Sequence, residues 1–294
     1  MTTDRRDTAG SVQVRRWHPA PAIRVSGALH AMGALTLAIQ PELWLWVVTV
    51  LAANHLVLIS AVFSPRGCLL GPNLSRLPAA FAKHGEVVLT FDDGPDPEVT
   101  PQILDLLDRF RMKASFFCIG EKAAAFPEIV NEIARRGHSV ENHTYRHSYA
   151  FAFYGISRLG RELDAAQSIL RENAGRPPRF FRAPVGFRSP LLDPVLATRG
   201  LHYVSWTRRG YDTVYTDPRV TLDKLTRGLA AGDILLLHDG SSAQTPAGQA
   251  MVLAVLPPLL DKLESEGLKS VALPDCFSTQ VKAEESALDA SALS

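Results

Sequence analysis

The chain has 294 residues, of which 46% are hydrophobic and 21% charged, and its formal net charge is +1. This length allows a sizeable core in one or two domains, and the near-neutral charge gives no basis for a nucleic-acid partner. Three widely separated cysteines, at positions 68, 118 and 276, form no metal-binding spacing and argue against a disulfide framework.

Two apolar stretches near the N-terminus predict a membrane segment. Residues 1–24 form a polar tail with five arginines, whereas residues 25–39 and 43–63 contain no Asp, Glu, Lys or Arg. At about 1.5 Å per residue, the second stretch can cross a hydrocarbon core of about 30 Å. Either both stretches cross as a hairpin that turns at Pro41, or only residues 43–63 cross. Two alternatives are a cleaved signal peptide, whose apolar region would be much shorter than this one, and a pair of helices buried in a core.

Basic residues flank these stretches and are missing from the turn between them. The positive-inside bias therefore favours a hairpin in a bacterial-type inner membrane, with both ends and the rest of the chain in the cytoplasm. A single span with its N-terminus inside would place the rest of the chain on the outer side.

Strands and helices alternate after a Pro- and Gly-containing linker at 64–85, in which a short helix at the membrane surface is an option. The expected strands are 87–91, 114–119, 138–142, 179–182, 201–206, 233–237 and 269–273. The expected helices are 100–111 (capped by Thr100), 121–136, 156–173, 191–198, 221–231 and 249–266. This order predicts an α/β fold with a parallel sheet, closed into a (β/α)7-type barrel over 86–275. Residues 276–294 are predicted to be a disordered tail.

Two adjacent carboxylates, Asp92 and Asp93, follow the strand at 87–91, which Gly94-Pro95 ends. The carboxyl ends of parallel strands are where α/β sheets and barrels present their chemistry. Because neighbouring strand residues point to opposite faces, the two carboxylates can do different jobs. The alternative is an ordinary turn, in which Asp-Asp-Gly is common.

His143 and His147 are four residues apart, a spacing that brings two imidazoles to one side of a helical turn. The pair alone can arise by chance, but it follows the strand that ends at Asn142, at the same end of the predicted barrel as Asp93. Two imidazoles and one carboxylate, with positions left for water, make a catalytic divalent metal site. Zinc is the expected ion, with cobalt, nickel and iron(II) as alternatives.

Hydrolysis of an acyl group at such a site needs an acid and a base. Asp92 is the expected base, oriented by Arg182, and His238 is the expected acid at another strand end. Asp212 can keep that imidazole protonated. Arg182, Asp212 and His238 could each be structural when taken singly, but their joint placement at strand ends predicts a hydrolytic active site.

Five segments in order resemble the signatures of the polysaccharide deacetylases, the NodB-homology fold of carbohydrate esterase family 4. The first two are Thr90-Phe91-Asp92-Asp93-Gly94-Pro95 and His143-Thr144-Tyr145-Arg146-His147. The others are Arg182-Ala183-Pro184-Val185-Gly186, Trp206 with Asp212 six residues later, and Leu236-Leu237-His238. The resemblance implies a distorted (β/α) barrel and metal-dependent removal of acyl groups from sugars. It also implies that Asp93, His143 and His147 bind the metal. Asp92 would be the base, held by Arg182. His238 would be the acid, tuned by Asp212.

The resemblance further implies a substrate pocket. Trp206 and Leu236 would line a space for the acyl methyl group, and the backbone N–H of Val185 would help to bind the tetrahedral oxyanion. The family often has an aromatic residue where Val185 stands and a Trp where Thr213 stands. These departures put recognition of a long polymer in doubt, and Phe187 or Tyr211 could compensate.

We therefore expect a membrane-anchored, metal-dependent hydrolase that removes N-acetyl groups from an amino sugar of a glycan or glycolipid. An active site facing the cytoplasm favours a lipid-linked or glycolipid sugar over a wall polymer. An O-acetyl esterase or a deformylase would use the same residues. A non-catalytic, membrane-tethered glycan-binding protein is a more distant alternative, against which the intact set of acids and histidines argues.

Overall fold

The computed structural model describes residues 16–82 and 84–276. Most of the expected polar N-terminal tail and of the expected disordered tail at 276–294 lies outside these residues. The division of the chain into tails, membrane segment, linker and catalytic domain stays a prediction.

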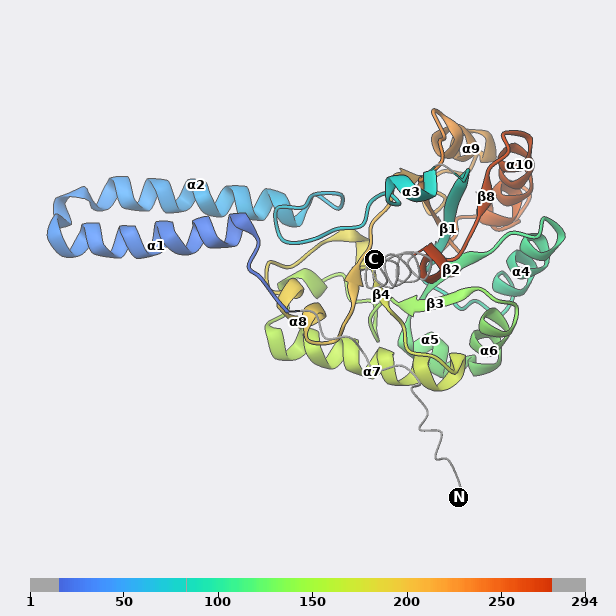
Figure 1. Cartoon of the computed structure of the whole chain (residues 1–294), viewed down its shortest axis with the longest axis horizontal. Coiled ribbons are helices and arrows are strands. Elements are labelled where there is room, and N and C mark those ends of the chain that lie inside the picture. The colour runs from blue at the N-terminus through green and yellow to red at the C-terminus, as the bar shows by residue number, and fades with distance from the viewer. Residues whose placement is uncertain (1–15, 83, 277–294) are drawn as a thin grey trace, which may run out of the picture.

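Two apolar helices form an antiparallel hairpin that projects away from the rest of the described chain (Figure 1). Helix α1 spans Pro21–Ile39, a short 3₁₀ turn η1 spans Pro41–Leu43, and helix α2 spans Trp44–Val62. The spans Pro21–Ile39 and Pro41–Val62 are long and apolar enough to cross a membrane, with mean hydropathy 1.4 and 2.1, and only 6% of the most apolar 18 residues of each is buried. The alternative of a buried helix pair is therefore wrong.

The remainder is a curled parallel sheet surrounded by helices (Figure 1). The strands are β1 Glu86–Asp92, β2 Ala114–Cys118, β3 Ser139–Asn142, β4 Phe180–Phe181, β5 His202–Tyr203, β6 Arg208–Arg209, β7 Ile234–His238 and β8 Lys269–Ser270. Their order is β5-β4-β3-β2-β1-β7-β6, and β8 pairs with the start of β1. The distorted (β/α) barrel implied by the family resemblance is confirmed, but the full closure expected from the alternation is wrong, because the sheet ends at β5 and β6.

The helices of this part are α3 Ala79–Ala82, α4 Thr100–Arg109, α5 Gly120–Ala125, α6 Pro127–Arg135, α7 Ile156–Ala174, α8 Leu192–Ala197, α9 Pro218–Thr226 and α10 Met251–Ser265, with 3₁₀ turns η2 Phe151–Phe153 and η3 Pro184–Gly186. The helix expected at 121–136 is two helices, since Pro127 has no N–H with which to continue the first. Thr100 does not cap α4; its hydroxyl donates to the buried Asp239 carboxylate at 2.6 Å.

The segment that leads from α2 to β1 packs into the gap between the two ends of the sheet. Leu74 forms a parallel bridge with Val204, just after β5. Three residues on, Leu77 N donates to Gly232 O at 2.8 Å, just before β7. The chain that leaves the hairpin thus becomes part of the barrel wall.

Strand β1 is the centre of the sheet and is buried on both faces, as parallel strands covered by helices are. Val87, Leu89 and Phe91 pack on the main core beneath α4, α6 and α10, while Val88 faces a second cluster inside the curl. This burial holds the carboxyl end of β1, and the two carboxylates there, in a fixed position.

Candidate active site

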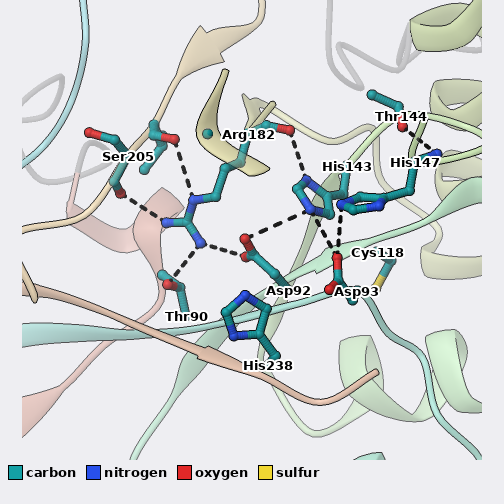
Figure 2. A network of polar contacts seen from close by, with 12 residues as sticks. Thr90, Asp92, Asp93, Cys118, His143, Thr144, His147, Arg182, Ser205 and His238 are labelled. Carbon is teal, nitrogen blue, oxygen red and sulfur yellow. Dashed lines mark hydrogen bonds and ion pairs between the residues drawn. The ribbon is translucent and has the colours of Figure 1, made fainter. Parts of the chain in front are cut away.

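Three potential metal ligands meet at the carboxyl ends of β1 and β3 (Figure 2). Asp93 Oδ1 lies 3.2 Å from His143 Nε2 and 3.1 Å from His147 Nε2. One ligand atom from each of the three residues lies within 4.8 Å of the others. The sequence prediction that these three side chains converge is confirmed.

The histidine pair lies on an irregular loop, so the expected helical turn is wrong. Thr144 and His147 have φ angles of 67° and 50°, in the left-handed region that costs about 1–3 kcal/mol for such residues. Two side chains fix the turn: Asn142 Oδ1 accepts a hydrogen bond from Thr144 N, and Thr144 Oγ1 accepts one from His147 N, each at 2.9 Å. The loop thus turns both imidazoles toward Asp93 without a helix.

The ligand set fits a divalent ion. Asp93 Oδ1 is buried and has no well-aligned hydrogen bond within the described residues. Its separation from the two imidazole nitrogens matches neighbouring ligands on one ion, which stand about 3–3.5 Å apart for bonds of about 2.1 Å. His143 Nδ1 donates to Arg182 O at 2.8 Å, which leaves Nε2 with a lone pair for the ion.

The protonation states also suit a metal site. Burial raises the pKa of Asp93, but contact with His143 and the charges of both imidazoles outweigh it, so the pKa lies well below its usual range. Burial and the charge of His143 lower the pKa of His147 to about 4. Near neutral pH the site therefore offers an ionised carboxylate and at least one neutral imidazole, the forms that bind metal.

Asp92, the neighbouring carboxylate, is held by a different partner (Figure 2). Arg182 Nη1 donates to Asp92 Oδ1 at 2.5 Å and to Thr90 Oγ1 at 3.0 Å, and Nη2 donates to Ser205 O at 2.9 Å. The guanidinium is fully buried and lies 4.1 Å from the Phe117 ring centre. Asp92 is therefore oriented without being one of the three clustered ligands.

His238 and Asp212 form a second buried pair. His238 Nδ1 donates to Asp212 Oδ1 at 2.9 Å, and its backbone N–H donates to Asp212 Oδ2 at 2.7 Å. Burial lowers the pKa of His238, but the charge and hydrogen bond of Asp212 outweigh it and raise the pKa above its ordinary value. This imidazole is thereby poised to carry a proton.

A cavity of about 140 Å³ joins these groups. Its lining includes the two carboxylates and the three histidines described above, Asp92, Asp93, His143, His147 and His238. The expected pocket residues Val185, Trp206 and Leu236 also line it. A space of this size admits a small acyl group together with water, each water occupying about 30 Å³ of liquid.

Two expected pocket residues lie elsewhere. The Phe187 ring packs edge-on against Phe63 at the end of α2, with centroids 4.9 Å apart, because the apolar end of the hairpin offers it a burial site. Tyr211 is 42% exposed and lies between Arg209 and Lys224. Neither Phe187 nor Tyr211 lines this cavity.

Some lining residues were missed by sequence reasoning. Tyr149, Arg209 and Ser241 line the cavity. Tyr149 follows His147 by two residues and its ring packs edge-on against that imidazole at 6.0 Å. A search of the residues next to each signature would have found Tyr149 and Arg209, since Arg209 lies between Trp206 and Asp212.

Comparison with known proteins agrees with this geometry. The sequence model of the family described as polysaccharide deacetylase matches residues 82–204. A peptidoglycan-N-acetylglucosamine deacetylase of Bacillus cereus is 35% identical over 202 residues, covering 66% of this chain and 69% of that protein. A chitooligosaccharide deacetylase of Azorhizobium caulinodans is 32% identical over 204 residues, covering 65% and 94%.

The fold has solved counterparts. The crystal structure of the Bc1960 peptidoglycan N-acetylglucosamine deacetylase, in complex with an N-hydroxybenzamide, superposes with a TM-score of 0.62 at 30% identity. The superposition covers 70% of this chain and 92% of that one.

Proposed function

The chain belongs to the polysaccharide deacetylase family, and from that membership we propose that it hydrolyses the N-acetyl group of an amino sugar in a glycan or glycolipid. The observation that carries the proposal is that the two adjacent carboxylates at the end of β1 have different partners. Asp93 faces two imidazoles, whereas Asp92 is held by Arg182. Its relatives named as deacetylases of peptidoglycan N-acetylglucosamine and of chitooligosaccharides support the same chemistry.

Asp93, His143 and His147 would hold a divalent ion, for which zinc suits two imidazoles and one carboxylate best. Cobalt, nickel and iron(II) fit the same ligand set. When bound there, the ion would lower the pKa of a water molecule and polarise the acyl carbonyl group.

Asp92 would accept the proton of the attacking water, as a general base within the cavity. Arg182 would fix the carboxylate in position, because its buried guanidinium has no freedom to follow another partner. His238 would donate a proton to the leaving nitrogen, and Asp212 would keep that imidazole protonated until then.

Three residues would place the acyl group. Trp206 and Leu236 offer apolar surface in the cavity for the methyl group, and the backbone N–H of Val185 would donate to the developing oxyanion.

We further propose that α1 and α2 anchor the enzyme in a bacterial inner membrane. Both ends of the hairpin lie on the side of the catalytic part, and the turn at Pro41–Leu43 lies at the far end (Figure 1). Arg24, in the first turn of α1, and Arg66, just beyond α2, lie at the near end of the hairpin, so the positive-inside bias favours a cytoplasmic active site.

The test is product analysis with the full chain in detergent. N-acetylated, O-acetylated and N-formylated glycans and glycolipids are offered separately, and the released acid is measured together with free amine and new hydroxyl groups. Equal yields of acetate and free amine from the N-acetylated substrates support N-deacetylation. Acetate released with a new hydroxyl would identify an esterase, formate a deformylase, and binding without any product a glycan-binding protein.

A further inference from the structure

The cavity holds a guanidinium that the reaction as described does not use. Arg209, on β6, lines the cavity, and its Nε is buried without a hydrogen-bond partner within the described residues. Its guanidinium carbon lies 5.4 Å from the Trp206 ring centre and 4.9 Å from that of Tyr211. The preceding Arg208, in contrast, pairs with the buried carboxylate of Asp233.

Among the described residues, this cation has no carboxylate partner of its own, although Asp92 and Asp93 line the same cavity. His238 lines the same cavity and has a raised pKa, and a divalent ion in the triad would add further positive charge. Asp92 is already paired with Arg182, so it is not free to neutralise Arg209. Lys224 Nζ lies 5.6 Å from the Tyr211 ring centre and adds to the positive charge near Arg209. A negatively charged substrate group would relieve the repulsion.

The cavity also lies next to the residues that follow the C-terminal end of α2, where the hairpin joins the rest of the chain. Gly186 lines the cavity, and a Cβ placed there would lie 3.0 Å from Pro65 and 2.8 Å from the Trp206 ring. Arg66, the next residue, donates to Thr207 O at 3.3 Å, two residues before Arg209. The residues that leave α2 thus border the same side of the cavity as Arg209.

We propose that the substrate is an N-acetylated amino sugar esterified to phosphate, and that Arg209 binds the phosphate. The proposal rests on the proposed deacetylation and names its substrate class. The guanidinium fork matches phosphate oxygens bidentately. Sugars carried on polyprenyl lipids are joined to them through phosphate, so such a sugar reaching the cavity from the membrane surface would present that group on the side of Arg209.

The experiment compares two water-soluble substrates that share one N-acetylated sugar, N-acetylglucosamine 1-phosphate and the neutral methyl glycoside. The full chain is used in detergent, and kcat/KM for acetate release is measured for each. We expect the phosphate to be favoured about 10- to 100-fold, the range of charged hydrogen bonds. Arg209→Gln should bring the ratio close to one, and Arg209→Lys should keep part of it.

The matched control is Arg219→Gln on α9, whose side chain is 90% exposed and pairs with Asp217. It removes the same charge away from the cavity and should leave the substrate ratio unchanged. A third substrate, the same sugar on a polyprenyl phosphate in phosphatidylglycerol vesicles, separates the sources of the anion. If kcat/KM for this third substrate exceeds that for N-acetylglucosamine 1-phosphate, the substrate is lipid-linked. If it does not, the substrate is a soluble sugar phosphate.

Equal kcat/KM of the wild-type chain for the phosphate and the neutral glycoside would overturn the proposal. So would an equal loss on both substrates in Arg209→Gln, which would make Arg209 part of the reaction or of the fold. The wild-type comparison decides even if Arg209→Gln does not fold. If no N-acetylated substrate releases acetate, the proposed deacetylation itself fails and takes this inference with it.

Discussion

Asp92 on β1 and His238 on β7 are register partners in adjacent parallel strands, and both side chains line one cavity. Each is held by a buried partner from another element, Asp92 by Arg182 and His238 by Asp212. The proposed base and acid therefore stand on the rigid centre of the sheet. Such preorganisation is what general acid–base catalysis requires.

Replacing Asp92 by Asn should lower kcat about 10²–10⁴-fold, the usual contribution of a general base. The amide keeps the shape of the side chain but cannot accept the proton. Zinc binding should persist, because Asp93 and not Asp92 belongs to the ligand cluster. Asp105→Asn, at an exposed site on α4, is the matched control. Wild-type kcat in Asp92→Asn would remove Asp92 from the role of base.

The pH profile of kcat/KM should report His238. Its pKa is raised by Asp212 against the effect of burial, with Asp92 and Asp93 adding in the same direction. The proposed acid works while protonated, so activity is present below this raised pKa and is lost as the pH rises through it. Asp212→Asn removes one negative charge and should shift this alkaline limb to lower pH. An unchanged limb would show that another group limits activity there.

Removing the guanidinium that holds Asp92 should destabilise the protein. In Arg182→Met the Asp92 carboxylate stays buried without its cation, which typically costs about 3–5 kcal/mol of unfolding free energy. The double variant with Asp92→Asn should lose less than the sum of the single variants, as measured by urea unfolding in detergent. Arg199→Met, which breaks a surface pair with Asp164, should cost about 1 kcal/mol or less. Strict additivity of Arg182→Met and Asp92→Asn would deny their coupling.

The catalytic end of the barrel could be predicted because long buried strands carry it. Residues Val87–Phe91 form an unmistakable apolar run, and the polar residues that follow must lie at its carboxyl end. The same reasoning placed His143 after β3 and His238 at the end of β7. Their convergence follows from parallel pairing alone.

Other features had no such signal. Strand β6 has only two residues, both arginines, so no periodicity marked Arg209 as a cavity residue, and only its position between Trp206 and Asp212 pointed to it. The place of Phe187 depends on Phe63, a contact between segments more than a hundred residues apart. The turn that carries His147 depends on left-handed backbone fixed by Asn142 and Thr144. A tertiary contact decides the place of Phe187, whereas the turn at His147 rests on local side-chain hydrogen bonds that no hydrophobic periodicity reveals.

Zinc affinity should depend on all three ligand side chains. His147→Gln keeps the volume close but replaces an imidazole nitrogen with an amide, so we expect zinc binding at least about 10-fold weaker by equilibrium dialysis. His138→Gln, a buried histidine away from the cluster, is the control and should leave the affinity unchanged. Equal zinc affinity of wild-type protein and His147→Gln would exclude His147 as a ligand.

The central claim is that one ion held by Asp93, His143 and His147 is required for acetate release. Its most direct test is a zinc titration of the metal-free full chain, with acetate release measured at each addition. We predict no release without metal and a rise that saturates at about one zinc per chain. Undiminished acetate release from the metal-free chain would contradict the account.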